Sequence, residues 1–165
     1  MATDRGYRAR VIVASTRAAT GVYPDRSGPI LIAGLQEIGF IAEDPVVVVD
    51  GDPVGQALRS AVAAGIDVVV TSGGTGCSPT DSTPEQTRAL IDREVPGIAE
   101  AIRAHGRAQG VPTADLSRGI AGLAGSTLIV NIAGSTGAAR DALVVLERLV
   151  IHVIDQVRGQ DHSPS

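Results

Sequence analysis

The chain alternates between short, unbroken runs of aliphatic residues and longer stretches in which aliphatic residues recur every three or four positions. The short runs are rich in valine and isoleucine and have no polar face, which is typical of strands buried on both sides. The pattern predicts four such strands, at residues 10–15, 41–49, 67–71 and 128–132.

The stretches between these strands combine helical spacing with residues that begin and end helices. Asp52 followed by Pro53 is typical of an N-cap and a first helical residue, and Thr83, Pro84 and Gln86 fit a capping box. The pattern predicts helices at residues 29–39, 52–64, 98–105 and 138–157 and one beginning at Thr83, with a long loop at 16–28 and a turn-rich stretch at 106–125.

Strands that alternate with helices, and that are aliphatic on both faces, indicate a mostly parallel sheet covered by helices on each side. A length of 165 residues corresponds to one domain, at roughly 100–200 residues per domain. No repeat or linker divides the chain. We therefore expect an α/β fold in a single domain spanning residues 1–165, with flexible termini at about residues 1–7 and 159–165.

All 14 basic residues are arginine, and the chain contains no lysine. This excludes the Walker A phosphate loop and every mechanism that needs a lysine nucleophile or base. A net charge of −4, with two tyrosines, one phenylalanine and no tryptophan, argues against nucleic-acid binding. A single cysteine, the absence of any apolar run near the ~20 residues of a membrane span, and an N-terminus unlike a signal peptide predict a cytoplasmic protein with no membrane partner.

Ligands of open α/β sheets bind beyond the carboxyl ends of the strands. Two predicted strands are followed there by near copies of one loop, SGGTG at residues 72–76 and AGSTG at residues 133–137. Small residues let backbone N–H groups approach an anion, and the second loop leads directly into a helix N-terminus. Both loops are candidate phosphate sites; the alternative for each is a tight turn that binds nothing.

Three aspartates, Asp50, Asp52 and Asp81, follow strands at the same predicted edge. Carboxylates and phosphates repel unless a cation lies between them, and Mg²⁺ takes one or two carboxylates together with phosphate oxygens. The alternative role of Asp52 is the helix N-cap, whereas Asp50 and Asp81 favour a ligand role. Because arginine is the only basic side chain, Arg17, Arg118 and Arg140 are the candidates to meet phosphates, and the alternative for each is a solvated surface charge. The residues alone predict a phosphate-handling, Mg²⁺-dependent α/β domain.

The stretch TSGGTGCSPTDSTPEQT, residues 71–87, resembles the signature of the molybdopterin adenylyltransferase family, the MogA/MoaB group that includes the G domain of gephyrin. The family pattern is T-x-G-G-T-G followed by D-x-T-P-E/D-x-T. Residues 21–25, 111–118 and 131–140 resemble further family segments, so that the similarity extends over about residues 8–157.

The resemblance implies a three-layer α/β/α sandwich, a homotrimer, and Mg-ATP-dependent adenylylation of molybdopterin with release of pyrophosphate. It implies that Asp81 is an acidic residue needed for catalysis, and that its carboxylate binds Mg²⁺. Asp50 is the best match for a second such acid, with Asp52 as its alternative. Molybdopterin and ATP would be the small-molecule partners, and other proteins of molybdenum cofactor biosynthesis are possible partners. The residues that match the family's pterin- and phosphate-binding loops are Ser72, Gly73, Gly74, Thr75, Gly134, Ser135 and Thr136.

The last of these loops departs from the family pattern. The family usually has Pro-Gly-Ser-Pro where this chain has Ala133, Gly134, Ser135 and Thr136. MoaB-type members often have Pro-Gly-Ser-Thr, and not every MoaB-type protein is catalytically active. The alternative to an enzyme is therefore a catalytically silent MoaB-type protein that binds molybdopterin or acts as a scaffold.

Overall fold

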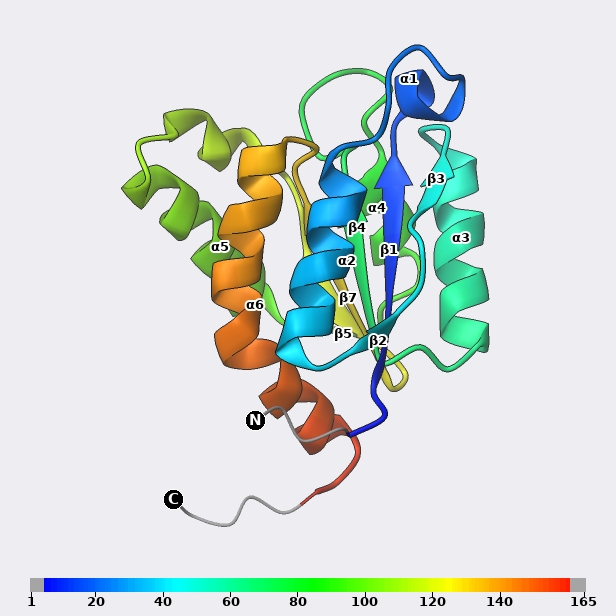
Figure 1. Ribbon diagram of the computed structural model, residues 1–165, viewed down its shortest axis with the longest axis vertical. Coiled ribbons are helices and arrows are strands. Elements are labelled where there is room, and N and C mark those ends of the chain that lie inside the picture. The colour runs from blue at the N-terminus through cyan, green and yellow to red at the C-terminus, as the bar shows by residue number, and fades with distance from the viewer. Residues whose placement is uncertain (1–4, 161–165) are drawn as a thin grey trace.

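The computed structural model describes residues 5–160, and within them a seven-stranded sheet forms the centre of the molecule (Figure 1). The strands β1, β2, β3, β4 and β7 are parallel, whereas β6 runs antiparallel to β7 and β5 antiparallel to β6. This confirms the predicted mostly parallel sheet. In sheet order the strands are β2 (Ile41–Ala42), β1 (Arg8–Ala14), β4 (Val68–Ser72), β7 (Thr127–Ile132), β6 (Ala121–Ala124) and β5 (Arg93–Glu94), with β3 (Val46–Val48) also paired to β1.

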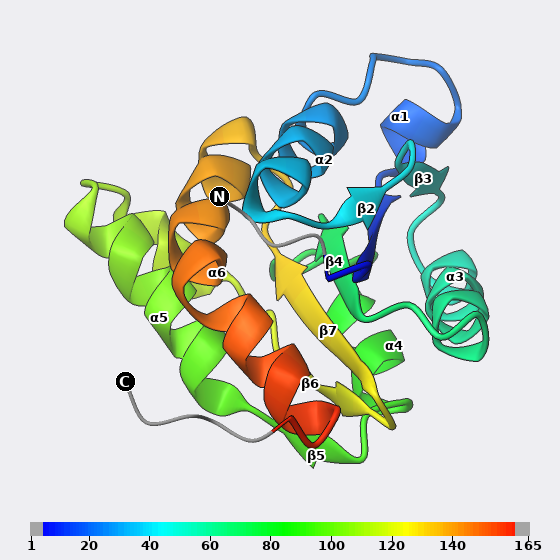
Figure 2. The same cartoon turned by 60° about the horizontal axis from the view of Figure 1, so that its bottom comes forward.

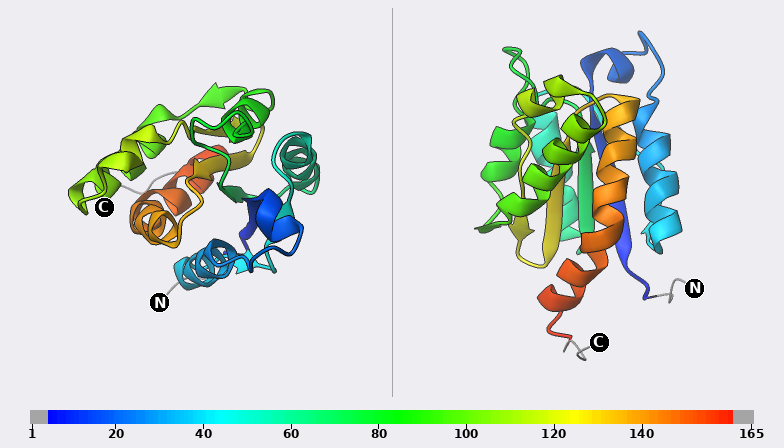
Figure 3. Two further views of the ribbon diagram at one scale, coloured as in Figure 1. Left: turned by 90° about the horizontal axis from the view of Figure 1, so that it is seen from above. Right: turned by 90° about the vertical axis from the view of Figure 1, so that its left-hand side faces the viewer.

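Helices cover both faces of the sheet and make three layers (Figures 2 and 3). One core lies between the sheet and the helices α2 (Ser27–Ile38), α5 (Pro96–Ala108) and α6 (Thr136–Val157). A second, smaller core lies under α3 (Asp52–Ala63) on the opposite face, where α4 (Thr83–Arg88) contacts α3. Successive strand residues point to opposite faces, so Val68 and Val70 belong to the first core and Val69 to the second. The expected α/β/α sandwich is confirmed.

The strand predicted at residues 41–49 is wrong as a single element. The structure has two short strands, β2 and β3, which pair with opposite ends of β1. Residues 43–45 separate them, and Pro45 has no N–H group to donate to a sheet. The continuous valine run concealed this interruption.

Both predicted side-chain caps are also wrong. The N-cap of α3 is Gly51, and Asp52 is already helical. The N-cap of α4 is Ser82, which makes no side-chain cap bond, and Thr83 is the first helical residue. The Gln86 side chain donates to Asp52 Oδ1 at 3.3 Å, so the reciprocal bonds of a capping box do not form.

Four further elements lie in segments that the sequence pattern left as loops or did not resolve. The predicted loop at residues 16–28 contains the single-turn helix α1 (Thr16–Ala19), and the turn-rich stretch at 106–125 contains the 3₁₀ helix η1 (Pro112–Leu116) and β6. The strand β5 was also missed, since β5 and β6 are short and carry no long aliphatic run.

No helix in the described part of the chain is long and apolar enough to span a membrane.

The residues at the start of β1 pack against the end of α6. The Arg5 guanidinium donates to both carboxylate oxygens of Asp155, at 2.9 and 2.7 Å, and the Tyr7 hydroxyl donates to Asp155 Oδ1 at 2.6 Å. Of the termini for which we expect flexibility, residues 1–4 and 161–165 lie outside the described residues, whereas Arg5 and Tyr7 have these defined contacts.

Candidate active site at the carboxyl edge of the sheet

The two glycine-rich loops that follow β4 and β7 meet at the carboxyl edge of the sheet. The Gly73 N–H donates to the carbonyl oxygen of Ile132 at 3.0 Å, at the end of β7. A Cβ atom placed on Gly134 would lie only 3.2 Å from Gly73 Cα. The structure therefore brings together the two loops that the sequence singled out, because β4 and β7 are adjacent and parallel.

Gly73 occupies a position that other residues cannot. Its φ is +97°, and a Cβ atom would lie 2.3 Å from the carbonyl oxygen of Ala14 at the end of β1. The absence of a side chain lets the loop cross directly over the ends of β1 and β7. The requirement for glycine here is steric as well as conformational.

The hydroxyl groups of these loops mainly make contacts within the protein. Ser72 Oγ and Ser27 Oγ form a buried hydrogen bond of 2.8 Å, and Thr75 Oγ1 accepts from Ser117 Oγ at 3.1 Å. Ser135 is the N-cap of α6, and its Oγ accepts from the Ala138 N–H at 3.0 Å. The cap forms with Ala133 in place of the family's proline, so this departure leaves the start of α6 regular.

Asp50 has one carboxylate oxygen fixed and the other turned toward the loop after β4. Its Oδ2 accepts from the N–H of Thr16 at 3.1 Å and from the Thr16 hydroxyl at 2.9 Å. Its Oδ1 would lie 3.3 Å from a Cβ atom on Gly74. Thr83 Oγ1 lies on the same side of Gly74 and is buried without a hydrogen-bond partner among the described residues. The carboxylate is therefore oriented by α1 toward the glycine-rich loop.

Asp52, the alternative to Asp50, lies in a different setting. It is an exposed residue of the first turn of α3, and its Oδ1 accepts only from the Gln86 side chain among the described residues. Gln86 in turn lies against Gly55 of the same helix. The structure places Asp50, and not Asp52, beside Gly74.

Asp81 ends the loop that leads from β4 to α4. Its Oδ2 accepts from the Ser78 N–H at 3.1 Å and would lie 2.8 Å from a Cβ atom on Gly76. No basic side chain of the described chain forms an ion pair with Asp50 or Asp81. The described residues also contain no group of three or more metal-ligating side chains. Two separate carboxylates thus stand along one glycine-rich loop.

The three candidate arginines differ in their surroundings. Arg17 and Arg140 are exposed residues of α1 and α6. Arg118 instead forms an ion pair with Glu85 and donates to two backbone carbonyl groups of the loop between Gly76 and Asp81. The hydrogen bond from Arg118 lowers the pKa of the Glu85 carboxyl below its ordinary value. Arg118 is therefore engaged by the protein, whereas Arg17 and Arg140 point to solvent.

A polar cavity of about 390 Å³ opens between the end of β1 and the start of α2. Ser15, Ser72, Gly134 and Thr136 contribute to its wall together with Asp25. Asp25 Oδ1 accepts from the Gly28 N–H at 3.1 Å, and its Oδ2 is buried without a partner among the described residues. Asp25 lies within the segment at residues 21–25 that resembles the family, but the sequence pattern indicates no role for it beyond its position just before a helix.

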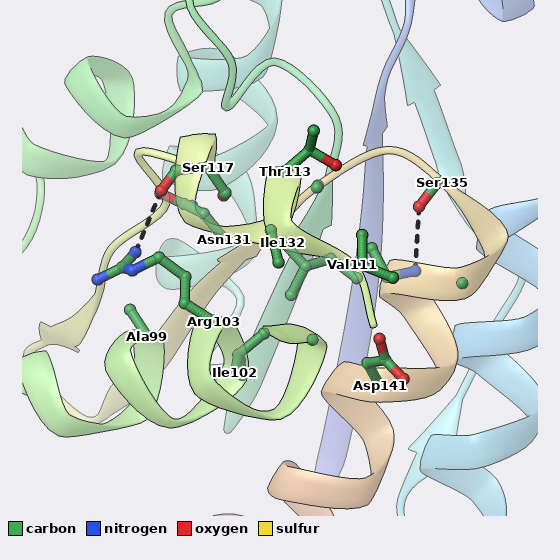
Figure 4. Close-up of a pocket in the computed structure, with 15 residues that line it drawn as sticks. Ala99, Ile102, Arg103, Val111, Thr113, Ser117, Asn131, Ile132, Ser135 and Asp141 are labelled. Carbon is green, nitrogen blue, oxygen red and sulfur yellow. Dashed lines mark hydrogen bonds between the residues drawn. The ribbon is translucent and has the colours of Figure 1, made fainter. Parts of the chain in front are cut away.

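A second, more apolar cavity of about 160 Å³ lies between α5, η1 and the start of α6 (Figure 4). Figure 4 shows Ile132 and Val111 near the middle of the view, Ile102 on the α5 side and Asp141 on the α6 side. The Arg103 side chain crosses its far end and donates to the carbonyl oxygens of Ser117 and Gly119 at 3.3 and 2.9 Å. Both cavities border the loop after β7, one on each side.

Comparison with known proteins connects this arrangement to a family. Residues 10–153 match the family described as a probable molybdopterin binding domain. The molybdopterin adenylyltransferase of Pyrococcus furiosus is 32% identical over 152 residues, which are 90% of this chain and 89% of that protein. The molybdenum cofactor biosynthesis bifunctional protein of Chlorobaculum tepidum is 36% identical over 158 residues, 94% of this chain but 50% of that protein. The chain thus spans about half the length of that relative and most of the length of the adenylyltransferase.

Solved structures agree with this relationship. The molybdopterin biosynthesis Mog protein of Mycobacterium ulcerans superimposes with a TM-score of 0.87 at 55% identity, over 92% of this chain and 99% of that one. The molybdopterin biosynthesis enzyme MoaB of Thermus thermophilus gives a TM-score of 0.85 at 37% identity, over 93% and 97%. From the carboxyl-edge loops, the matched family and these neighbours together, the chain belongs to the MogA/MoaB family of molybdopterin-binding proteins of molybdenum cofactor biosynthesis.

Proposed function

We propose that this chain transfers the AMP group of Mg-ATP to the terminal phosphate of molybdopterin and releases pyrophosphate. The observation that carries this function is the placement of Asp50 and Asp81 along one glycine-rich loop, at Gly74 and Gly76, with no basic partner for either carboxylate. Unpaired carboxylates beside a loop of small residues suit a site that binds phosphate through a cation.

The chemistry needs no base from the protein. An oxygen of the terminal phosphate of molybdopterin, already anionic at neutral pH, attacks the α-phosphorus of ATP. A new P–O bond forms, the bond from the α-phosphorus to the oxygen bridging to the β-phosphorus breaks, and pyrophosphate takes the electron pair. The described histidines, His105 and His152, lie within α5 and α6, and neither lines the polar cavity beside Ser72 and Gly134. The residues of the site would act by aligning the phosphates and neutralising their charge.

The donor atoms at this edge fit Mg²⁺. Mg²⁺ prefers oxygen ligands and is usually held by one or two carboxylates together with substrate phosphates and water. Asp50 Oδ1 faces Gly74, and the buried hydroxyl of Thr83 on the same side has no partner among the described residues. We assign the metal to Asp50 and Asp81, where it would neutralise triphosphate charge, and Asp52 is not needed.

The neighbouring loops would hold the two substrates. Thr16 orients Asp50 through two hydrogen bonds, and Ser78 orients Asp81 through its N–H. Backbone N–H groups of the loop at residues 73–75 and the N-terminus of α6 at Thr136 would bind phosphate groups. The polar cavity is large enough for a ring system, and Asp25 in its wall brings an acceptor for the N–H donors of a pterin.

The proposal also covers the location, the assembly and the partners of the protein. We propose a cytoplasmic homotrimer, with no nucleic acid or membrane partner. Light scattering during size-exclusion chromatography tests the assembly and should give about three times the chain mass of 16.8 kDa. A mass equal to one chain would contradict the trimer without affecting the assignment of the site.

Pyrophosphate release tests the reaction directly. Purified protein with molybdopterin, ATP and Mg²⁺ should release one pyrophosphate for each AMP attached to molybdopterin, and omission of any one of the three should abolish release. Asp44→Asn is the control and should release pyrophosphate at the original rate, because Asp44 is an exposed acid that precedes β3, at the end of the strand away from Asp50. Molybdopterin binding without pyrophosphate would instead identify a silent binding protein.

A further inference from the structure

Arg118 crosses the loop that carries Asp81 and contacts both of its ends. Its Nε donates to the carbonyl oxygen of Gly76 at 2.8 Å, where the loop begins. Its Nη2 donates to the carbonyl oxygen of Asp81 at 3.0 Å, where the loop ends. Its Nη1 pairs with the carboxylate of Glu85 in the first turn of α4. One planar guanidinium therefore joins three points, in addition to the backbone hydrogen bond of 3.0 Å that the Thr83 N–H donates to the carbonyl oxygen of Gly74.

The segment around Arg118 is fixed independently of its side chain. The Arg118 N–H donates to the carbonyl oxygen of Thr75 at 2.8 Å, and the preceding Ser117 hydroxyl donates to Thr75 Oγ1 at 3.1 Å. These bonds attach the strand-like segment after η1 to the end of the glycine-rich loop. The guanidinium thus extends from an anchored backbone, which is the condition for it to hold something else in place.

The loop at residues 77–80 has few contacts of its own. All four residues are exposed, and the hydrogen bonds of the loop are mostly between its own members, such as Ser78 Oγ with Thr80 Oγ1 at 3.1 Å. Asp81 takes its orientation from the Ser78 N–H, which belongs to this loop. The direction of the Asp81 carboxylate therefore depends on whatever keeps the loop closed, and Arg118 makes the contacts that reach both ends.

We propose that Arg118, supported by Glu85, is a positioning residue that sets the orientation of Asp81 for metal binding, and not a residue that binds the phosphates of ATP. Nε, Nη1 and Nη2 each already have an acceptor in the protein, so every nitrogen of the guanidinium takes part in holding the loop, and a phosphate could meet only the N–H groups left over. This role rests on the proposed function, because it assigns a metal to Asp81.

Lysine cannot replace arginine in this position. An ammonium group is a compact charge on a flexible stem, and it cannot present the planar fork that reaches Gly76, Asp81 and Glu85 together. Arg118→Lys keeps the charge and one of the three contacts. Residues that orient metal ligands typically change metal affinity or activity by roughly 10- to 100-fold when altered. Glu85→Gln should act in the same direction more weakly, since the two carbonyl contacts remain.

Two readouts test this role in the full chain. Hydrogen–deuterium exchange measures the backbone amides of residues 76–78, 80 and 81, and pyrophosphate release is measured as a function of Mg²⁺ and of ATP concentration. Arg118→Lys should speed exchange in this loop, and it should raise the Mg²⁺ concentration for half-maximal rate by roughly tenfold or more. At saturating Mg²⁺, kcat and the KM for ATP should stay within about threefold of the original protein.

Arg88→Lys is the matched control, because Arg88 is another arginine of this region that pairs with a glutamate, Glu94, at 3.5 Å. It should change neither readout. Unchanged exchange of the loop at residues 76–81 in the Arg118→Lys variant would overturn the positioning role. A raised KM for ATP with an unchanged Mg²⁺ requirement would also overturn it and would identify Arg118 as a phosphate ligand. If the original protein released no pyrophosphate, the proposed function would fail, and the exchange comparison would still decide whether Arg118 holds the loop.

Discussion

The two edges of the sheet treat their charged residues in opposite ways. At the amino edge, Asp67 accepts from the Arg8 N–H at 2.7 Å and pairs with Arg158, and the Arg158 guanidinium lies 4.4 Å from the centre of the Tyr7 ring. Asp155 pairs with Arg5 and accepts from Tyr7. These carboxylates have arginine partners, and the contacts tie the end of α6 to the starts of β1 and β4.

The carboxyl edge leaves its acids without such partners. Asp50 and Asp81 accept from hydroxyl and N–H groups only, and the side chain of Thr83 has no partner among the described residues. The same parallel strands thus end in a charge-paired network on one side and in unpaired carboxylates on the other. Under the proposed function, the amino edge contributes stability and the carboxyl edge binds charge from outside.

The largest effect that we expect is the loss of pyrophosphate release when Asp81 is substituted, and it would sharpen the comparison of the two edges. Asp81→Asn keeps an oxygen that can accept from the Ser78 N–H but removes the charge that would bind the metal. Pyrophosphate release should fall by roughly 100- to 1,000-fold. The free energy of unfolding in urea should change by less than about 1 kcal/mol. A variant with the original rate would show that Asp81 is not a metal ligand.

A substitution at Gly73 should cost stability, although Gly73 lies at the carboxyl edge. It is therefore the exception to the division between a stabilising amino edge and a binding carboxyl edge. In Gly73→Ala the added methyl group would lie 2.3 Å from the Ala14 carbonyl oxygen at a φ of +97°. We expect a loss of about 3 kcal/mol in the free energy of unfolding. Gly125→Ala is the control, since its φ is also positive but the space around it is open, and it should lose about 1 kcal/mol. Equal losses would mean that the close approach to β1 contributes nothing.

The amino edge should show the reverse pattern at Asp67. Asp67→Ala removes the acceptor for the Arg8 N–H and the partner of Arg158, and it should lower the free energy of unfolding by about 2 kcal/mol. Pyrophosphate release by the folded protein should stay within about threefold of the original rate. Asp44→Ala, which alters an exposed acid, should cost less than about 0.5 kcal/mol. A strong loss of activity in folded Asp67→Ala would contradict the separation of the two edges.

The smallest effect concerns pH. Burial raises the pKa of the Tyr7 phenol, and the hydrogen bond to Asp155 raises it further. Because the pKa is higher in the folded than in the unfolded chain, the stabilisation is complete below about pH 10 and is lost as pH rises through the folded value. Urea unfolding at increasing alkaline pH should show this loss in the original protein. Tyr7→Phe should cost about 1 kcal/mol at pH 8 and lack the Tyr7 part of the pH dependence; an identical pH profile would rule out the titration of Tyr7.

The fold was predictable where hydrophobic patterning is strong. The β1, β4 and β7 strands are unbroken aliphatic runs, and their helices have clear spacing, so the parallel core followed from the sequence. The β2–β3 interruption did not, because the valine run after Pro45 has the same pattern as a continuous strand. The strand β6 was also not predictable, because it is only four residues long and contains a glycine, Gly122. A side chain at Gly122 would collide with the backbone carbonyl oxygen of Arg93 in β5.

The candidate site was predictable to the level of its loops and less so for individual contacts. The rule that ligands meet the carboxyl ends of strands gave both glycine-rich loops and the aspartates, but Asp50 and Asp52 could be separated only by their three-dimensional neighbours. The contacts of Arg118 with Gly76 and Asp81 span about forty positions of sequence, and no local pattern encodes them. Local pattern predicts which residues reach an edge, and tertiary packing decides what each of them touches.

The comparison of Asp50→Asn with Asp52→Asn tests most directly whether the geometry of the carboxyl edge defines the site. The two acids are two positions apart and carry the same charge, but only Asp50 faces Gly74. Measured as AMP transfer to molybdopterin at fixed Mg²⁺ and ATP, the rate should fall by roughly 100-fold or more in Asp50→Asn and by less than about threefold in Asp52→Asn. A large loss in Asp52→Asn with near-normal transfer by Asp50→Asn would contradict the account.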